Sequence, residues 1–359
     1  MLEDYFNKID VNETYSPEEL GKNISHLPLE ELPKEQVKVA LIGVGIQTDL
    51  IRKELYKLHV GEIKEHEIID LGNIKESIDL YPALKIVTHE LIGTSIIPVL
   101  IGQELDLIQP IHEGLSMHHV ALNISYISSH IPTDKGELLH PLITNTFTRS
   151  QLNFIGHQSH YVSSKKLNTL YDTHHGQLRL GKLRTNLEES ELFLRNSELA
   201  IMDLNAIKVA EAPAKKEINS SGLTSEEACQ IARYAGMSDC NKCFGLLGFV
   251  ARLDDRNKTA QLCAQILWYF FQGAVKRIDD QPNSHIEFIK YRCDFDDTST
   301  PILFLKSKKT DRWWMKIEHP AEPDNADLAI IVPCTYEDYL ISANGDTPDR
   351  YLNALRLLK

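Results

Sequence analysis

One short segment places a carboxylate, an amide and an ammonium group close together in the chain. Residues 199–202 form an apolar run short enough for a buried parallel strand, and Asp203, Asn205 and Lys208 follow it. Open α/β sheets keep their ligand sites at the carboxyl ends of strands. A carboxylate binds divalent cations well, whereas an amide is a weaker ligand and a lysine adds positive charge. The segment therefore has the position of a metal site with only part of its chemistry.

Histidine is the second kind of metal ligand that the sequence offers, with 15 in the chain. His157 and His160 follow a predicted strand at 152–155. Their spacing of three suits one metal ion only on a helical turn, and no neighbouring carboxylate is implied. We expect surface or hydrogen-bonded histidines here. A replacement metal site that joins them to Glu104 and Asp203 is the alternative.

Apolar runs that alternate with helical patterns must position these side chains. This alternation predicts an α/β fold with a mostly parallel sheet. Helices are predicted at 48–56, 224–236 and 259–272, with Gly236 and Gly273 ending the last two. Strands are predicted at 37–44, 67–70, 96–101, 119–123, 152–155, 199–202 and 243–249.

The turn after the first strand raises a cofactor alternative. Gly43 and Gly45 form a G-x-G at a strand end, and Asp70 closes the second strand, where a ribose-binding acid could stand. Thr48 replaces the third glycine of the dinucleotide motif. We therefore expect a tight turn rather than a nucleotide site, and we expect no cofactor.

Composition excludes several classes of protein. The 359 residues are 42% hydrophobic with a net charge of -13, which disfavours binding to nucleic acid or an anionic membrane. No apolar run is long enough to span a membrane, and the acidic start is unlike a secretory signal. Six dispersed cysteines indicate reduced thiols, so we expect a cytoplasmic protein. Cys240 and Cys243 form a C-x-x-C without further ligands nearby, and we interpret them as structural thiols.

The pattern changes after about residue 285. Short β-like runs are predicted at 286–291, 301–305, 313–317 and 328–332, followed by a helix at 335–343 in which Asp338 serves Thr335 as a capping acid. Trp313 and Trp314 are adjacent, so they face opposite sides of a strand. Either one ring packs inward while the other meets a partner, or the tryptophans cover the end of the sheet.

The segment at 201–209 resembles the S-x-D-x-D-x-x-D-P loop of the ureohydrolases, the family of arginase, agmatinase and formimidoylglutamase. In that family two aspartates of this loop bind a manganese pair. Asp203 matches the first aspartate. Asn205, Lys208 and Val209 stand in place of the second aspartate, the third aspartate and the proline.

Two further metal motifs of the family are altered. After the predicted strand 119–123, Asn123, Ser125 and Ile127 replace the three ligands of D-A-H-x-D. After the strand at 96–101, Glu104 takes the place of a histidine ligand. A glutamate can bind manganese, and a solvent-facing loop glutamate is the alternative. We expect no metal, with Asp203 and Glu104 as the weak candidates.

Framework segments resemble the family more closely. Residues 222–227 are similar to its G-L-T-x-x-E helix start, in which Thr224 and Glu227 predict a capping box. Asp254 and Thr259 match E-x-N-P-x-x-D-x-x-x-x-T-A, but Gly248 replaces the glutamate that binds the cationic head of the substrate in that family. Matches are therefore concentrated at caps and core positions, and mismatches at the chemistry.

The resemblance covers about residues 37–273 and implies a three-layer α/β/α fold of the arginase type with a cleft at the carboxyl ends of the strands. The predicted organisation is an N-terminal extension at 1–36, the α/β domain at 37–284 and a β-rich C-terminal extension at 285–359 packed on it.

The altered motifs predict a binding or scaffold module that has lost the manganese pair and hydrolase activity. A protein partner or a small molecule would bind in the cleft, where His157, His160 and Lys208 are the candidates. The alternative is a manganese-dependent hydrolase of linear amidines with an atypical metal site. The sequence leaves a homo-oligomer open.

Overall fold

The computed structural model describes residues 2–7, 9, 14–26, 28, 31–33, 35–119, 121–144, 149–173, 175–282, 287–294, 301–319, 321–322 and 329–356. The chain divides into two compact units. Unit 1 comprises residues 1–171 and 175–277, and unit 2 comprises residues 172–174 and 278–359. Residues 1–36 are part of unit 1, and the predicted boundary at 284/285 lies seven residues beyond Arg277.

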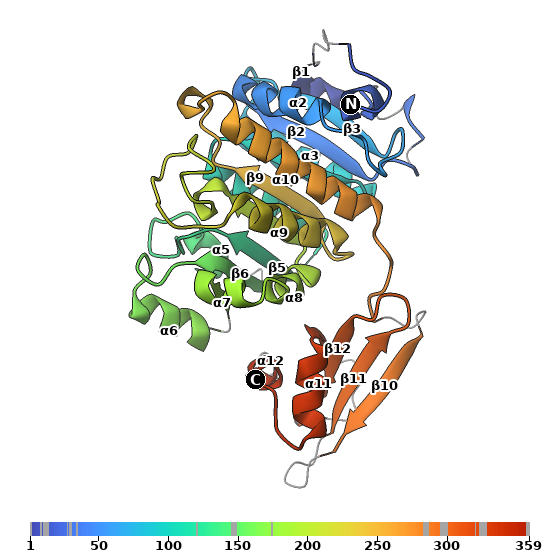
Figure 1. Ribbon diagram of the computed structural model, residues 1–359, viewed down its shortest axis with the longest axis vertical. Helices are drawn as coiled ribbons and strands as arrows, with labels where there is room; N and C mark the ends of the chain where they lie inside the picture. Colours follow the sequence, from blue (N-terminus) through green and yellow to red (C-terminus); the bar gives the residue numbers. More distant parts are fainter. Residues whose placement is uncertain are drawn as a thin grey trace. The chain divides into compact units, whose positions relative to one another are not determined.

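Unit 1 is built around one large β-sheet (Figure 1). Among its described residues, nine strands pair in the order β1-β3-β2-β4-β9-β8-β5-β6-β7. All neighbouring strands are parallel except β1 and β3. The bounds are β1 Phe6–Asn7, β2 Val39–Val44, β3 Ile68–Ile74, β4 Ile97–Gly102, β5 Ala121–Ile127, β6 Arg149–His157, β7 Gly176–Arg179, β8 Leu199–Asp203 and β9 Cys243–Leu247.

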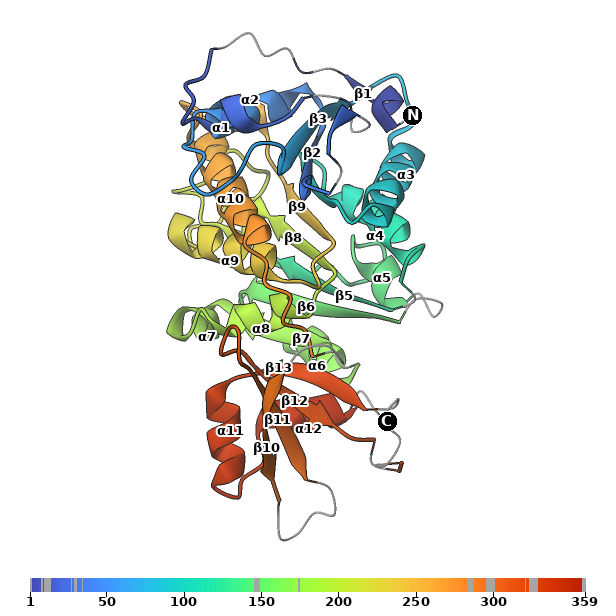
Figure 2. The same cartoon turned by 90° about the vertical axis from the view of Figure 1, so that its right-hand side faces the viewer.

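Helices cover both faces of the sheet, as the view in Figure 2 shows. Successive strand residues point to opposite faces, so Leu41 of β2 belongs to one hydrophobic cluster and Ile42 to the other. Helices α1, α2 and α7 to α10 contribute to the first cluster, and α3 to α6 to the second. The predicted three-layer α/β/α arrangement is confirmed. The bounds are α1 Leu20–Asn23, α2 Asp49–Tyr56, α3 Leu80–Gly93, α4 Ile108–Ser116, α5 His140–Thr144, α6 Ser164–Asp172, α7 Leu180–Thr185, α8 Glu189–Arg195, α9 Ser225–Met237 and α10 Lys258–Val275.

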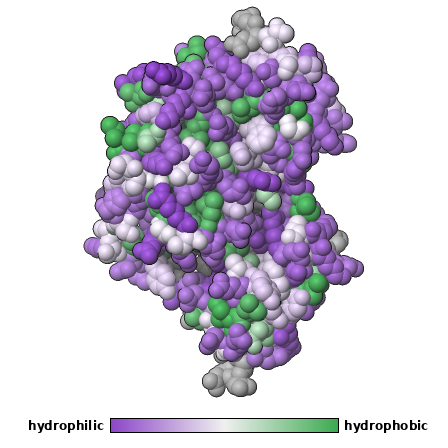
Figure 3. Space-filling model, viewed as in Figure 1, coloured by the Kyte–Doolittle hydropathy of each residue, from purple (hydrophilic) through white to green (hydrophobic). Residues whose placement is uncertain are grey.

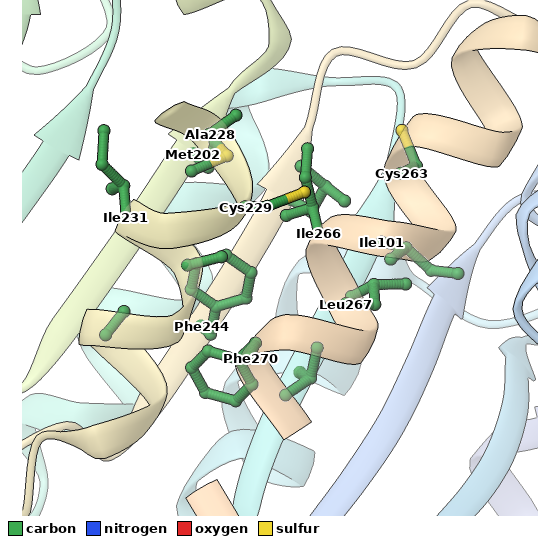
Figure 4. Packing of buried hydrophobic residues seen from close by; sticks show 14 of the residues in the cluster. Ile101, Met202, Ala228, Cys229, Ile231, Phe244, Cys263, Ile266, Leu267 and Phe270 are labelled. Atoms are coloured by element: carbon green, nitrogen blue, oxygen red, sulfur yellow. The ribbon is translucent and has the colours of Figure 1, made fainter. Parts of the chain in front are cut away.

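The centre of the first cluster lies where α9 and α10 pack on the sheet (Figure 4). Phe244 of β9 and Phe270 of α10 stack with ring centroids 4.4 Å apart. Ile231 of α9 and Ile266 of α10 are fully buried in the same cluster. The predicted capping box is present at the start of α9, where Thr224 accepts from the backbone of Glu227 and the Glu227 carboxylate accepts from the backbone of Thr224. Local capping therefore starts the helix and apolar burial holds it.

The prediction that Gly236 and Gly273 end these helices is wrong, because α9 continues to Met237 and α10 to Val275. Both glycines lie where the two helices come into close contact. A Cβ on Gly236 would lie 2.2 Å from the Phe270 carbonyl oxygen, and a Cβ on Gly273 would lie 2.5 Å from that of Arg233. The glycines are needed for close packing of the helices and not for a turn.

The prediction that the fourth strand ends at Asn123 is also wrong. β5 continues to Ile127, and it pairs with β6 on one side and β8 on the other. The polar residue Ser125 is accommodated inside the strand because its hydroxyl group bonds that of Ser197 at 2.7 Å. This longer strand changes which residues reach the carboxyl edge of the sheet.

Unit 2 contains an antiparallel sheet in the order β10-β11-β12-β13 among its described residues. Trp313 packs in its hydrophobic cluster and stacks on Tyr339 with centroids 5.2 Å apart, whereas Trp314 lies edge-on to Phe288. Both tryptophans are buried, which favours the interpretation that they cover the sheet. The predicted capping acid Asp338 accepts from the backbone of Thr335. Ile286 and Leu328, where two strands were expected to begin, lie outside the described residues. The bounds are β10 Phe288–Cys293, β11 Ile302–Ser307, β12 Trp313–Ile317, β13 Ile330–Cys334, α11 Tyr336–Ala343 and α12 Asp349–Leu355.

On the face drawn in Figure 3, hydrophilic side chains predominate and hydrophobic ones occur in small groups. No helix in the described part of the chain is long and apolar enough to cross a membrane.

The close packing of α9 on α10 gives a stability prediction. We expect Gly236→Ala to lower the free energy of unfolding by about 1–3 kcal/mol, because the added methyl group forces the helices apart. Gly181→Ala in α7 is the matched control, since nothing lies within 4 Å of its Cβ position. Urea unfolding followed by circular dichroism measures both variants. Equal stability of the two variants would contradict the packing role of Gly236.

Candidate functional site

Asp203 is the last residue of β8, and its side chain is buried at the carboxyl edge of the sheet, only 2% exposed. The hydroxyl groups of Tyr126 and Ser128 donate to Oδ2 at 3.0 and 2.9 Å. The backbone N–H of Asn205 donates to Oδ1 at 2.8 Å. Burial raises the pKa of the Asp203 carboxyl group, and these hydrogen bonds oppose the shift. Both oxygens of this carboxylate are therefore engaged by the protein itself.

An ammonium group lies beside this carboxylate, on the loop that follows β8. Lys215 is 2% exposed, and its Nζ donates to the Leu204 carbonyl oxygen at 3.2 Å. The Ile207 carbonyl oxygen and Asn219 Oδ1 accept from the same nitrogen. Burial lowers the pKa of Lys215 to about 8, and the nearby charge of Asp203 opposes that shift.

Asn205 stabilises the same loop through its side chain and its backbone. The side-chain Oδ1 accepts from the backbone N–H of Glu217 at 3.3 Å, and the backbone carbonyl oxygen accepts from Asn219 Nδ2 at 3.0 Å. Asn219 Nδ2 also donates to the Ser221 carbonyl oxygen at 2.9 Å. Asn205, which stands in place of the second aspartate of the motif, is therefore hydrogen-bonded within the loop itself.

The two other charged candidates are paired near the surface. Lys208 forms an ion pair with Glu211 at 2.7 Å, and Glu104 forms one with Lys216 at 2.8 Å. The neighbouring ammonium group of Lys216, by hydrogen bonding, lowers the pKa of Glu104. Glu104 is exposed, so it does not join the buried group around Asp203.

His157 and His160 lie in different surroundings. His157 ends β6, is buried, and its Nδ1 has no hydrogen-bond partner among the described residues. Burial lowers the pKa of His157. His160 is exposed and lies against the ring of Tyr161, with centroids 4.2 Å apart. The structure thus does not bring the two histidines together with Glu104 and Asp203 as the alternative metal site requires.

The register of the strands relocates the fourth-strand motif. Ile127 of β5 lies opposite Met202 of β8, so Ser128, the next residue, reaches the level of Asp203. Asn123 and Ser125 lie earlier in β5, where the Glu198 carboxylate accepts from the backbone N–H of Asn123 at 2.6 Å. Asn123, Ser125 and Ile127 are therefore residues inside the strand and not in the loop that follows it.

Sequence reasoning did not single out Tyr126, Ser128 or Lys215. Tyr126 and Ser128 were missed because the strand was expected to end too early. Lys215 is twelve residues from Asp203, and no periodic pattern marks a lysine that folds back from a loop. The sequence feature that could have pointed to it is the pair Lys215-Lys216, which lies in the loop that follows the carboxyl end of a predicted strand.

The structure gives the G-x-G turn and Asp70 a packing role. Asp70 is buried and accepts from Arg52 Nε and Nη2 at 2.8 and 3.1 Å and from the Tyr56 hydroxyl group at 2.7 Å. A Cβ on Gly43 would lie 1.9 Å from Asn73 Oδ1. The acid that was considered for a ribose is thus already bonded inside the protein, and Gly43 makes room for this polar cluster.

The fold of this chain is similar to that of several solved structures. No family model matches the chain, and no curated protein sequence does either. Solved structures do match it. A Trypanosoma cruzi formiminoglutamase with manganese has a TM-score of 0.64 at 15% identity, over 72% of this chain and 99% of that one. The chain has the arginase-type fold. A formimidoylglutamase from Bacillus subtilis has a TM-score of 0.63 at 15% identity, over 75% and 96% of the two chains. An arginase from Bacillus cereus has a TM-score of 0.54 at 15% identity, over 66% and 98%.

The predicted ureohydrolase resemblance is therefore confirmed for the fold. Ser128 is the residue after β5, at the level of Asp203, and His130 lies two residues beyond it. His130 Nδ1 bonds Ser129 Oγ at 2.8 Å, and its ring stacks on Tyr161 with centroids 4.4 Å apart. The loop after β5 therefore carries an imidazole near the carboxyl edge.

The side chains at this edge do not fit the manganese pair that the fold family implies. Manganese prefers carboxylate and imidazole donors, and a pair of ions needs several of them. No group of three His, Cys, Asp or Glu among the described residues could hold a metal ion. Asp203 already accepts three hydrogen bonds, and the Lys215 ammonium group adds positive charge next to it.

The lowered pKa of Lys215 predicts a pH dependence of stability. The unfolded chain keeps this proton up to about pH 10.5, whereas the folded chain releases it near pH 8. The unfolded state therefore binds more protons between these values, and the free energy of unfolding rises with pH there, by up to about 3 kcal/mol from this group.

Chemical unfolding of the protein and of Lys215→Met at pH 7, 8, 9 and 10 measures the effect. We expect the rise in the protein and a flatter curve in the variant. The exposed Lys53→Met is the control and should follow the protein. Parallel curves for the protein and Lys215→Met would contradict the buried ammonium group.

Proposed function

We propose that this protein is a ureohydrolase-fold binding or scaffold module that has lost the binuclear manganese site and hydrolase activity. The observation that carries the proposal is the state of Asp203. Its two oxygens accept from Tyr126, Ser128 and the Asn205 backbone, and a buried ammonium group lies nearby. These contacts satisfy a carboxylate that would otherwise need a cation.

The requirements of two-metal hydrolysis also support the proposal, because the side chains that it needs are replaced in this chain. Such enzymes use two metal ions to generate a hydroxide at neutral pH and to stabilise the charge that develops on the substrate. Asp203 is the one carboxylate at the positions of the two aspartate motifs, since Asn123, Ile127, Asn205 and Lys208 stand in place of the other aspartates. Gly248 has no side chain with which to bind a cationic substrate head.

Metal ions would also have to displace groups that the protein holds in place. Two divalent cations beside Lys215 would repel its ammonium group, and moving that group would leave three buried oxygen acceptors without a donor. A buried acceptor left without a partner costs about 1–3 kcal/mol. The hydrogen bonds of the loop thus compensate the Asp203 charge in place of a metal ion, and their loss would make metal binding unfavourable.

A second candidate function is hydrolysis of the C–N bond of a linear amidine with an atypical metal site. It is favoured by the fold shared with a formiminoglutamase and an arginase, and by His130 in the loop after β5. Under either function we expect a small-molecule ligand or a protein partner at the carboxyl edge of the sheet.

Metal content and activity separate the two functions. The full chain is purified with manganese chloride in all buffers, and bound metal is measured by mass spectrometry. Release of urea, formamide or ammonia is then assayed with arginine, agmatine, guanidinobutyrate and formimidoylglutamate. We expect a manganese stoichiometry near zero and no turnover, because no set of donors in the described part of the chain is arranged for the metal.

Asp203→Asn is the matched variant, because an amide still accepts from the Asn205 backbone and the two hydroxyl groups can reorient toward it. We expect it to lower the free energy of unfolding by about 1–3 kcal/mol, because hydrogen bonds are kept but the charge opposite Lys215 is lost. Two bound manganese ions, or turnover that Asp203→Asn abolishes, would show instead that the site is active.

A further inference from the structure

A cavity of about 340 Å³ lies at the opposite edge of the same sheet, where the strands begin. It is bordered by the end of α3, the turn into β4, the residues before β5 and β9, and Arg277, the second residue after α10. The lining residues are Ile92, Gly93, Ser95, Ile96, Ile97, His118, His119, Lys242 and Arg277. All of them belong to unit 1.

Basic groups line this cavity without a carboxylate among the lining residues. Arg277 is held by two hydrogen bonds to helix and loop ends, from Nε to the Gly236 carbonyl oxygen at 2.8 Å and from Nη1 to that of Asn241 at 2.9 Å. Its remaining nitrogen, Nη2, is buried and has no partner in the described part of the chain. A buried guanidinium nitrogen without an acceptor is unfavourable, so an anion that displaces the side chains covering Nη2 would supply the acceptor that it lacks.

Lys242 contributes the second positive charge. Its Nζ makes one long hydrogen bond, to the Asp239 carbonyl oxygen at 3.3 Å, which leaves further N–H donors available. Burial lowers the pKa of Arg277 to about 10, so this guanidinium is still charged at neutral pH. The charge of Glu198 interacts with Lys242 and that of Asp239 with Arg277, and neither acid lines the cavity.

The carbonyl groups at helix C-termini explain some of these basic residues. Arg277 bonds the last turn of α9, and His118 Nε2 bonds the His89 carbonyl oxygen of α3 at 2.9 Å. These contacts leave Arg277 Nη2, most of the Lys242 ammonium group and an apolar wall of three isoleucines unused. Positive donors beside an apolar wall suit an anion that carries a small hydrocarbon group.

We propose that this cavity binds a small organic anion, whose oxyanion group meets Arg277 and Lys242 and whose apolar part lies on Ile92, Ile96 and Ile97. A water molecule occupies about 30 Å³ in the liquid, so the cavity has room for roughly ten non-hydrogen atoms. The oxyanion is a carboxylate or a phosphate group. This site is distinct from the carboxyl edge and goes beyond the function proposed there.

Calorimetric titration of the full chain with inorganic phosphate and, separately, with butyrate tests the proposal at low salt. Saturable binding of either probe is expected. Tighter binding of butyrate identifies a carboxylate on a hydrocarbon group, and tighter binding of phosphate identifies a phosphate ligand. Lys242→Gln should weaken binding about tenfold or more, because one charged donor to the anion is lost.

Two further variants keep the test independent of folding. Arg277→Lys keeps the charge but loses the fixed nitrogen, and it should also weaken binding. Lys53→Gln removes the same charge from an exposed site on α2 and should bind as the protein does. Circular dichroism confirms that each variant is folded. No binding of either probe at millimolar concentration, or equal binding by Lys242→Gln, would overturn the proposal.

Discussion

A carboxylate that is shielded from water at the end of β8 sets the structure of the carboxyl edge. Burying a charge is unfavourable unless donors or an opposite charge compensate it. Asp203 has both kinds of compensation. The hydroxyl groups of Tyr126 and Ser128 and the backbone N–H of Asn205 donate hydrogen bonds to it. The ammonium group of Lys215 supplies the opposite charge. The path of the loop after β8 follows from this need, since the chain must return far enough to bring Lys215 to the strand end.

The same arrangement explains how a fold whose solved relatives include manganese proteins can order this loop with its own side chains. Lys215 bonds three oxygens of the loop, and Asn219 bonds two more, so one ammonium group and one amide connect both ends of the segment. Removing one member of a buried polar network leaves its partners unsatisfied, which is costly. We interpret the network as the element that keeps the carboxyl edge in one conformation.

Sequence reasoning recovered features that depend on local signals and missed those that depend on distant partners. Capping boxes, buried apolar runs and strand–helix alternation are local, and they identified the mostly parallel α/β sheet and the start of α9. The three layers were implied by the family resemblance. The end of β5 was missed because the D-A-H-x-D motif of the family was expected to begin at Asn123, and no local signal shows that Ser125 bonds Ser197 inside the strand. Gly236 was assigned to a helix end, since nothing in the sequence shows that Phe270 packs against it.

The two edges of the sheet differ in how their buried polar groups are hydrogen-bonded. At the carboxyl edge, where this fold class places its ligand sites, the polar groups around Asp203 are bonded to one another, so a ligand there must compete with internal partners. His157 Nδ1, at the end of β6, is the exception at this edge among the described residues. At the amino edge, Arg277 keeps a buried nitrogen without an acceptor beside a cavity. An unpaired buried donor is unfavourable in the absence of a ligand and is satisfied when an acceptor binds. The two positive charges of Arg277 and Lys242 beside the cavity, together with the unpaired Arg277 nitrogen, are therefore the reason that we place the proposed anion site at the amino edge and not at the usual position of sites in the fold.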